Sequence, residues 1–147
     1  MNGEVTGSES LPAVDGDATE LVRTSMPFCA TIGVCAATST ADRVVLMLPW
    51  DASLCTTGGV LHGGVLMALA DSSGAMCAFL NLPADATGTS TIESKTNFLG
   101  AAADGTVVAT SVPLHAGGST IVIETELRVG DRLIGKTTQT QIVRRAR

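Results

Sequence analysis

The sequence predicts an α+β domain in which one curved antiparallel sheet of about six strands wraps around a single long central helix. The helix is predicted by residues 65–80, which hold no Lys, Arg, Glu or Pro and are rich in Leu, Met and Ala. Two strand-like runs precede this stretch, and four runs rich in Val, Ile and Thr follow it. The gaps between the last four runs are short, which indicates antiparallel neighbours, because parallel crossovers need about a dozen residues.

The expected elements begin with a short helix over 19–25. Two strands then span 31–37 and 43–49, and the central helix ends before Pro83, which cannot continue it. The remaining strands form a meander over 89–99, 105–116, 120–129 and 133–144. So long a sheet leaves an outer face or an edge strand to be covered, and a homo-oligomer would cover it.

Length and composition indicate one domain with an aliphatic core. The chain has 147 residues, and its hydrophobic fraction of 45% includes three Phe, one Trp and no Tyr. Residues 1–18 are rich in Gly, Ser and acids, so we expect a disordered acidic segment there and a single domain over 19–147.

Charge and cysteine usage restrict the class of partner and the compartment. A net charge of −5 argues against a nucleic-acid-binding surface, and the apolar helix is too short for a membrane span and carries an acid. The four cysteines form no C-x-x-C pair and the polar start is unlike a signal peptide, so we expect reduced thiols in the cytoplasm. Two histidines without close ligand pairs predict no metal site, and we expect no cofactor.

The start of the central helix and its middle carry the candidate chemistry. Gly63 and Gly64 fall in the first turn, where backbone N–H groups lack helical partners and can polarise a carbonyl oxygen. Glycine there also lets a substrate approach closely. Asp71 places a carboxylate in an apolar run, where it is costly unless it is used or paired. This carboxylate can attack a carbonyl or act as base on a water.

The spacing of Gly63 and Asp71 decides whether a single chain can form a complete catalytic site. Gly63 and Asp71 are eight residues apart, or about 12 Å along a helix. Both must lie within roughly 3 Å of one carbonyl to act together. If both are catalytic, two antiparallel copies of the helix must meet, and the site lies between the subunits of a twofold dimer.

Plainer interpretations stay open at this point. The H-G-G sequence can be a tight turn into a helix, and His62 can make only local hydrogen bonds. Asp71 can be a structural acid that bonds Ser72, Ser73 or a strand backbone. His115 fits an ordinary strand residue.

The motif L-H-G-G-x-x-x-x-L-x-D, which runs from Leu61 to Asp71, resembles the signature of hotdog-fold acyl-CoA thioesterases. It is most similar to their PaaI-like, phenylacetate-pathway branch. The resemblance covers about residues 26–145 and continues in 91–102, 113–115 and 138–143. It implies the hotdog fold, in which a curved antiparallel sheet wraps one long helix, in agreement with the expected strand order.

The resemblance also implies roles for individual residues. Asp71 matches the helical acid that acts as nucleophile or general base on the thioester. Gly63 matches the residue whose backbone N–H polarises the thioester carbonyl across the dimer interface, and His62 matches the histidine that orients this turn or contacts the thioester. Thr91 matches a Ser or Thr that helps to position water or the acid, and a one-residue change of register would put Ser90 there instead.

Two departures concern substrate binding. Relatives commonly carry Asn six residues before the histidine, where this chain has Thr56, whose hydroxyl can still form a hydrogen bond. Relatives often carry an Arg after the P-L-H sequence, and this chain has none there. The cations left for the CoA phosphates are Lys95, Arg128, Arg132 and Lys136.

The resemblance therefore implies an acyl-CoA thioesterase that hydrolyses a small or medium acyl-CoA, aliphatic or aromatic, to free acid and CoA. CoA would be part of the substrate, and the homodimer would be required for the site, with a homotetramer built as a dimer of dimers. The alternatives are a non-catalytic acyl-CoA-binding protein or a dehydratase on the same fold, and an oligomeric scaffold without a ligand.

Overall fold

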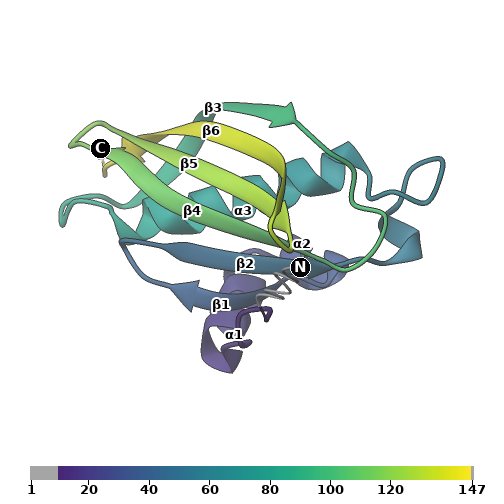
Figure 1. Cartoon of the computed structure of the whole chain (residues 1–147). Helices are drawn as coiled ribbons and strands as arrows, with labels where there is room; N and C mark the ends of the chain where they lie inside the picture. The colour runs from purple at the N-terminus through teal and green to yellow at the C-terminus, as the bar shows by residue number, and fades with distance from the viewer. Residues whose placement is uncertain (1–9, 147) are drawn as a thin grey trace, which may run out of the picture.

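The computed structural model describes residues 10–146, in which a six-stranded sheet curves over one long helix (Figure 1). The helices are α1 (Gly16–Ser25), α2 (Pro27–Ile32) and α3 (Gly63–Leu80), with a short 3₁₀ turn η1 (Ala52–Leu54). The strands are β1 (Cys35–Ser39), β2 (Val44–Pro49), β3 (Gly88–Phe98), β4 (Thr106–Ala116), β5 (Thr120–Val129) and β6 (Arg132–Arg144). The predicted α+β class, the antiparallel sheet and the central helix are confirmed.

The order of the strands differs from the expected meander. The sheet runs β1-β2-β4-β5-β6-β3, so β3 pairs with β6 and not with β4, the next strand in the chain. Residues 99–105 connect β3 to β4 across the end of the sheet, and Ala102 in this connection is buried and accepts a hydrogen bond from Leu61 N–H. A short gap allows a hairpin but does not force one when both strands find longer partners elsewhere.

The pairing of β3 with β6 contains one irregularity that affects the site. Thr91 pairs with Gln141, but the next residue in register on β3 is Glu93, so Ile92 is an extra residue in the strand. Such a bulge changes which later side chains face the helix. After it, Phe98 pairs with Gly135, on the same side of the sheet as Thr91 and Gln141.

Helix α3 forms because its run of Leu, Met and Ala packs on the aliphatic concave face of the sheet. His62 is its N-cap and Asn81 its C-cap. One stripe of this helix lies outside the core, because Met67, Asp71 and Phe79 are exposed in the single chain. The expectation that this helix is too short for a membrane span is wrong, because its 18 residues and their composition would fit one. Half of this stretch is nevertheless buried within the fold, as in the core helix of a globular protein.

The N-terminal part corrects two expectations. Asp15 caps α1 by accepting a hydrogen bond from Ala18 N–H at 2.9 Å, so residues 16–18 are helical and not disordered. Residues 1–9 lie outside the described residues. Helix α2 occupies the first part of the strand expected over 31–37. Pro27 favours a helix start at its first turn, and Gly33, with a φ of 83°, ends the helix. Strand β1 therefore begins only at Cys35.

Candidate active site

One backbone N–H group in the first turn of α3 has no hydrogen-bond acceptor among the described residues. His62 Nδ1 accepts a hydrogen bond from Gly64 N–H at 2.8 Å, which fixes the turn. The Gly63 N–H has no acceptor among residues 10–146. A free N–H at a helix N-terminus, where the helix dipole favours negative charge, can polarise a carbonyl oxygen. Gly64, bonded to His62, lies exposed beside it.

The aromatic ring of Phe98, at the end of β3, lies against Gly63. A Cβ at this position would lie 3.3 Å from Phe98 Cζ, which is a tight contact. The small residue at this position therefore leaves room for the ring. The contact also brings the C-terminal end of β3 to the start of α3, so the strand and the helix run in opposite directions.

Two buried glutamine amides of β6 hold Asp71 and Thr91. Gln139 Nε2 donates to Asp71 Oδ1 at 2.6 Å and to Thr91 Oγ1 at 3.2 Å. Gln141 Nε2 donates to the same Thr91 oxygen at 2.6 Å. Gln139 and Gln141 are 0% and 1% exposed, so the amides are fixed by the fold while the Asp71 side chain remains open to solvent on one side.

The surroundings of Asp71 shift its titration. Partial burial raises the pKa of the Asp71 carboxyl above that of an ordinary aspartate, and a hydrogen bond from Thr91 partly offsets this effect. A carboxylate with a raised pKa is a stronger base than a solvated one, which suits proton transfer or attack on a carbonyl.

The other residues expected in the site are not brought to Asp71. Ser90 points to the opposite face of β3 from Thr91 and accepts a hydrogen bond from Arg144 Nη1 at 3.3 Å. Lys95 pairs across the strands with Thr138, on the outer face of the sheet. It therefore lies on the opposite face from Asp71, and its expected role in the substrate site is not supported. Thr56 lies exposed in the loop before α3, where its N–H bonds Val60 O at 2.8 Å.

Sequence reasoning missed the two glutamines. Gln139 and Gln141 are two residues apart on β6 and therefore share one face, which the structure shows to be the face packed on α3. Long amides on the buried face of a strand need partners, and this pattern is the signal that could have identified them.

Gly63 and Asp71 lie on the same helix, eight residues apart, which corresponds to about 12 Å. Within one chain they cannot contact the same carbonyl group. If the carboxylate and the N–H are to act on the same carbonyl group, a second chain is needed.

Comparisons with known proteins show the family and the fold. The sequence pattern of the thioesterase superfamily matches residues 58–136, which include the α3 stretch and β3 to β5. A protein of Saccharolobus solfataricus named "putative esterase" is 34% identical over 94 residues, which are 63% of this chain and 65% of that protein, just under two thirds of its length.

Two solved structures share the fold. A thioesterase from Haemophilus influenzae is 25% identical with a TM-score of 0.77, and the match covers 85% of this chain and 86% of that one. A thioesterase family protein from Silicibacter pomeroyi is 26% identical with a TM-score of 0.79, over 88% and 98% of the two chains. With its family pattern, its six-stranded sheet around α3 and its H-G-G turn, the chain belongs to the thioesterase superfamily.

Proposed function

We propose that this protein is an acyl-CoA thioesterase of the PaaI-like branch, which hydrolyses an acyl-CoA to free acid and CoA. The observation that carries the proposal is the pair of groups on α3: a free Gly63 N–H at the helix start, and an Asp71 carboxylate that Gln139 holds at mid-helix. One group stabilises an oxyanion and the other supplies a base or a nucleophile, which are the two functions that acyl transfer to water requires.

The active unit is a homodimer. Strand β3 is an edge of the sheet, and the exposed stripe of α3 beside it carries Met67 and Phe79 at 41% and 57% exposure. An open edge strand next to exposed apolar side chains favours pairing with a second copy. A twofold axis there would bring the partner's Gly63 to Asp71 and complete the site, which the 12 Å separation within one chain prevents.

The chemistry follows from these positions. The thioester carbonyl oxygen accepts a hydrogen bond from the partner's Gly63 N–H, and Asp71 removes a proton from water as the water oxygen adds to the carbonyl carbon. The tetrahedral intermediate collapses, the C–S bond breaks, and the CoA thiolate leaves and takes up the proton that Asp71 removed from water. In the nucleophilic variant, an Asp71 oxygen adds first and a mixed anhydride forms, which water then hydrolyses.

The test is the release of free CoA thiol from a panel of acyl-CoA thioesters by wild type and Asp71→Asn. We expect turnover on at least one member, with kcat lowered at least about 100-fold in the variant, the range for loss of a general acid–base group. The melting temperature and the oligomeric state of both proteins control for folding.

Near-wild-type kcat in a folded Asp71→Asn dimer would refute the assigned role. Stabilisation by acyl-CoA without thiol release would identify a non-catalytic binding protein instead. Appearance of ¹⁸O from labelled water in Asp71 after a single turnover would identify the anhydride route.

A further inference from the structure

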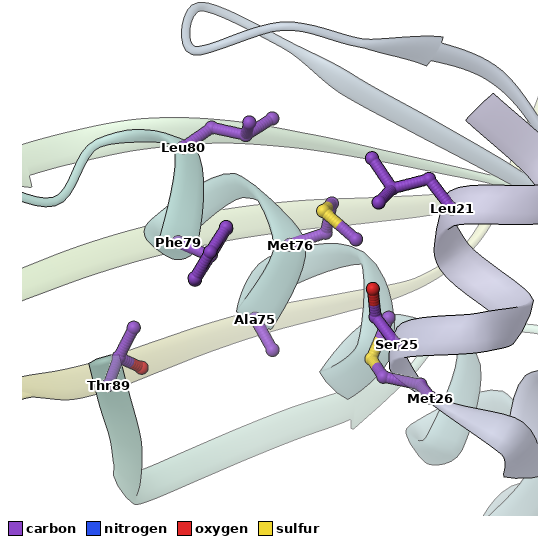
Figure 2. A pocket seen from close by; sticks show the side chains of 8 residues that line it. All are labelled: Leu21, Ser25, Met26, Ala75, Met76, Phe79, Leu80 and Thr89. Atoms are coloured by element: carbon purple, nitrogen blue, oxygen red, sulfur yellow. The ribbon is translucent and has the colours of Figure 1, made fainter. Parts of the chain in front are cut away.

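A cavity of about 380 Å³ lies between α1, the C-terminal half of α3 and the start of β3 (Figure 2). Most of its wall is aliphatic or aromatic, from Leu21 and Met26 on one side and Ala75, Met76 and Phe79 on the other. A volume of this size is in the range of pockets for small ligands. The proposed chemistry at Asp71 does not use this space.

The cavity continues from the site along the same face of α3. Ala75 follows Asp71 by four residues, one helical turn or about 6 Å, and so lies beneath it on the same side. On the strand side, Thr89 lines the cavity and is hydrogen-bonded to Gln141, the residue that also donates to Thr91 beside Asp71. Helix and strand thus connect the cavity to the carboxylate from both sides.

The lining indicates the chemistry of the occupant. Among the residues that the structure describes, no charged side chain lines the cavity, and its polar side chains are the hydroxyls of Ser25 and Thr89. Burial of apolar surface is therefore the main interaction that it offers. Methionine and leucine side chains in the wall can adjust to a flexible ligand.

We propose that this cavity takes the acyl group of the substrate, and that the group is a medium-length hydrocarbon chain. The inference rests on the proposed function. With the thioester carbonyl at Asp71, the chain runs along α3 past Ala75 toward Phe79, two turns or about 12 Å from the carboxylate. Its end lies against Leu21 and Met26, so α1 forms the wall that limits chain length. A two-carbon acyl group would leave the cavity unfilled, and a charged one would find no partner.

The first test compares kcat/KM for acetyl-, butyryl- and octanoyl-CoA. We expect an increase of about fourfold for each added methylene that is buried. Ala75→Leu fills the cavity and should lower the octanoyl-to-acetyl ratio at least about tenfold. Leu21→Ala enlarges it and should shift the optimum to longer chains. Leu114→Ala is the matched control, because Leu114 is a leucine of β4 with 57% exposure against 48% for Leu21, and it does not line the cavity.

The second test does not depend on turnover. Octanoate, the expected product, should raise the melting temperature of the wild type and of Leu114→Ala with increasing concentration, and should do so much less in Ala75→Leu. Octanoate stabilisation without thiol release from any thioester would support the cavity assignment and refute the proposed function. Thiol release with the same chain-length profile in wild type, Leu21→Ala and Ala75→Leu, or a preference of the wild type for acetyl-CoA, would overturn the cavity assignment and leave the thioesterase standing.

Discussion

Gly74 lies directly against the side-chain amide of Gln139, and a Cβ at position 74 would overlap the Gln139 Oε1 atom. This oxygen is buried and has no hydrogen-bond partner within the part of the chain that the structure describes, while the nitrogen of the same amide donates to Asp71. Glycine inside a helix costs about 1 kcal/mol relative to alanine. Here it makes the room that lets a strand amide reach the candidate catalytic acid.

Gly74→Ala should therefore separate activity from stability. The new methyl group pushes the Gln139 amide away from Asp71, and we expect kcat to fall about tenfold or more. The gain in helix propensity, about 1 kcal/mol, offsets part of the packing cost, so the free energy of unfolding should change little. Thiol-release kinetics and urea unfolding measure the two effects. Gly16→Ala is the control, because it is a helical glycine with nothing within 4 Å of the added Cβ. Unchanged turnover in Gly74→Ala would show that the Gln139 contact does not matter.

The Gly63 N–H can be removed without breaking the helix. Gly63 is the first residue of α3, where proline is well tolerated, and His62 already has the extended φ and ψ of −62° and 135° that suit a residue before proline. We expect Gly63→Pro to lower kcat by about 100- to 1,000-fold, as for loss of one oxyanion donor. Gly63→Ala keeps the N–H and meets the same Phe98 ring, so it serves as the matched control.

A site shared between two subunits predicts complementation. When inactive Gly63→Pro and Asp71→Asn proteins are mixed, unfolded and refolded together, half of the dimers carry both variants, and each of these has one intact site. The mixture should regain roughly a quarter of the wild-type activity. No recovery in a mixture that forms heterodimers would place the two residues in separate sites.

The exposed stripe of α3 should be the dimer contact. Met67→Glu places a charge on this stripe, so we expect a monomer on light scattering and loss of turnover, since Asp71 then lacks the partner's Gly63. Val14→Glu, at a position that is 59% exposed before α1, should remain dimeric and active. A Met67→Glu monomer with full activity would contradict the shared site.

The raised pKa of Asp71 predicts an acid limb in the pH profile. The carboxylate is the active form, so kcat/KM should fall as the pH drops through a pKa above the usual value of about 3.9. Thr91→Val removes the hydrogen bond that lowers this pKa, and its acid limb should move to higher pH. An acid limb at the same pH in both proteins would argue against Asp71 as the titrating group.

The same pKa shift has a consequence for stability. Because the pKa of Asp71 is higher in the folded state than in the unfolded state, ionisation of Asp71 opposes folding. The free energy of unfolding should therefore decrease as the pH rises from the unfolded-state pKa through the folded-state pKa. Asp71→Asn should therefore be at least as stable as wild type at neutral pH, measured by urea unfolding.

Much of this arrangement could be predicted from the sequence, because local composition carries it. The apolar run of α3, its glycine turn and the β-branched strands each have a short-range signal. Thr91 is indicated by the resemblance to the family, because strand alternation alone leaves the choice between Ser90 and Thr91 open. The pairing of β3 with β6 could not be predicted, because it depends on which partner buries more surface and not on the gap to β4. The role of Gln139 could not be predicted either, because it depends on a contact with a helix residue, Gly74, that is distant in the sequence.

The extra residue Ile92 in β3 has a final consequence. Thr91 and Phe98 are seven positions apart, an odd number, so on a regular strand they would face opposite sides of the sheet. Because the bulge at Ile92 adds one residue, the side chains of Thr91 and Phe98 face the same side of the sheet. Both face α3, Thr91 beside Asp71 and Phe98 against Gly63. The number of residues between these two positions, more than their identity, lets one strand contact both the start and the middle of α3. A deletion of Ile92 would turn one of them outward even if every contact residue were retained.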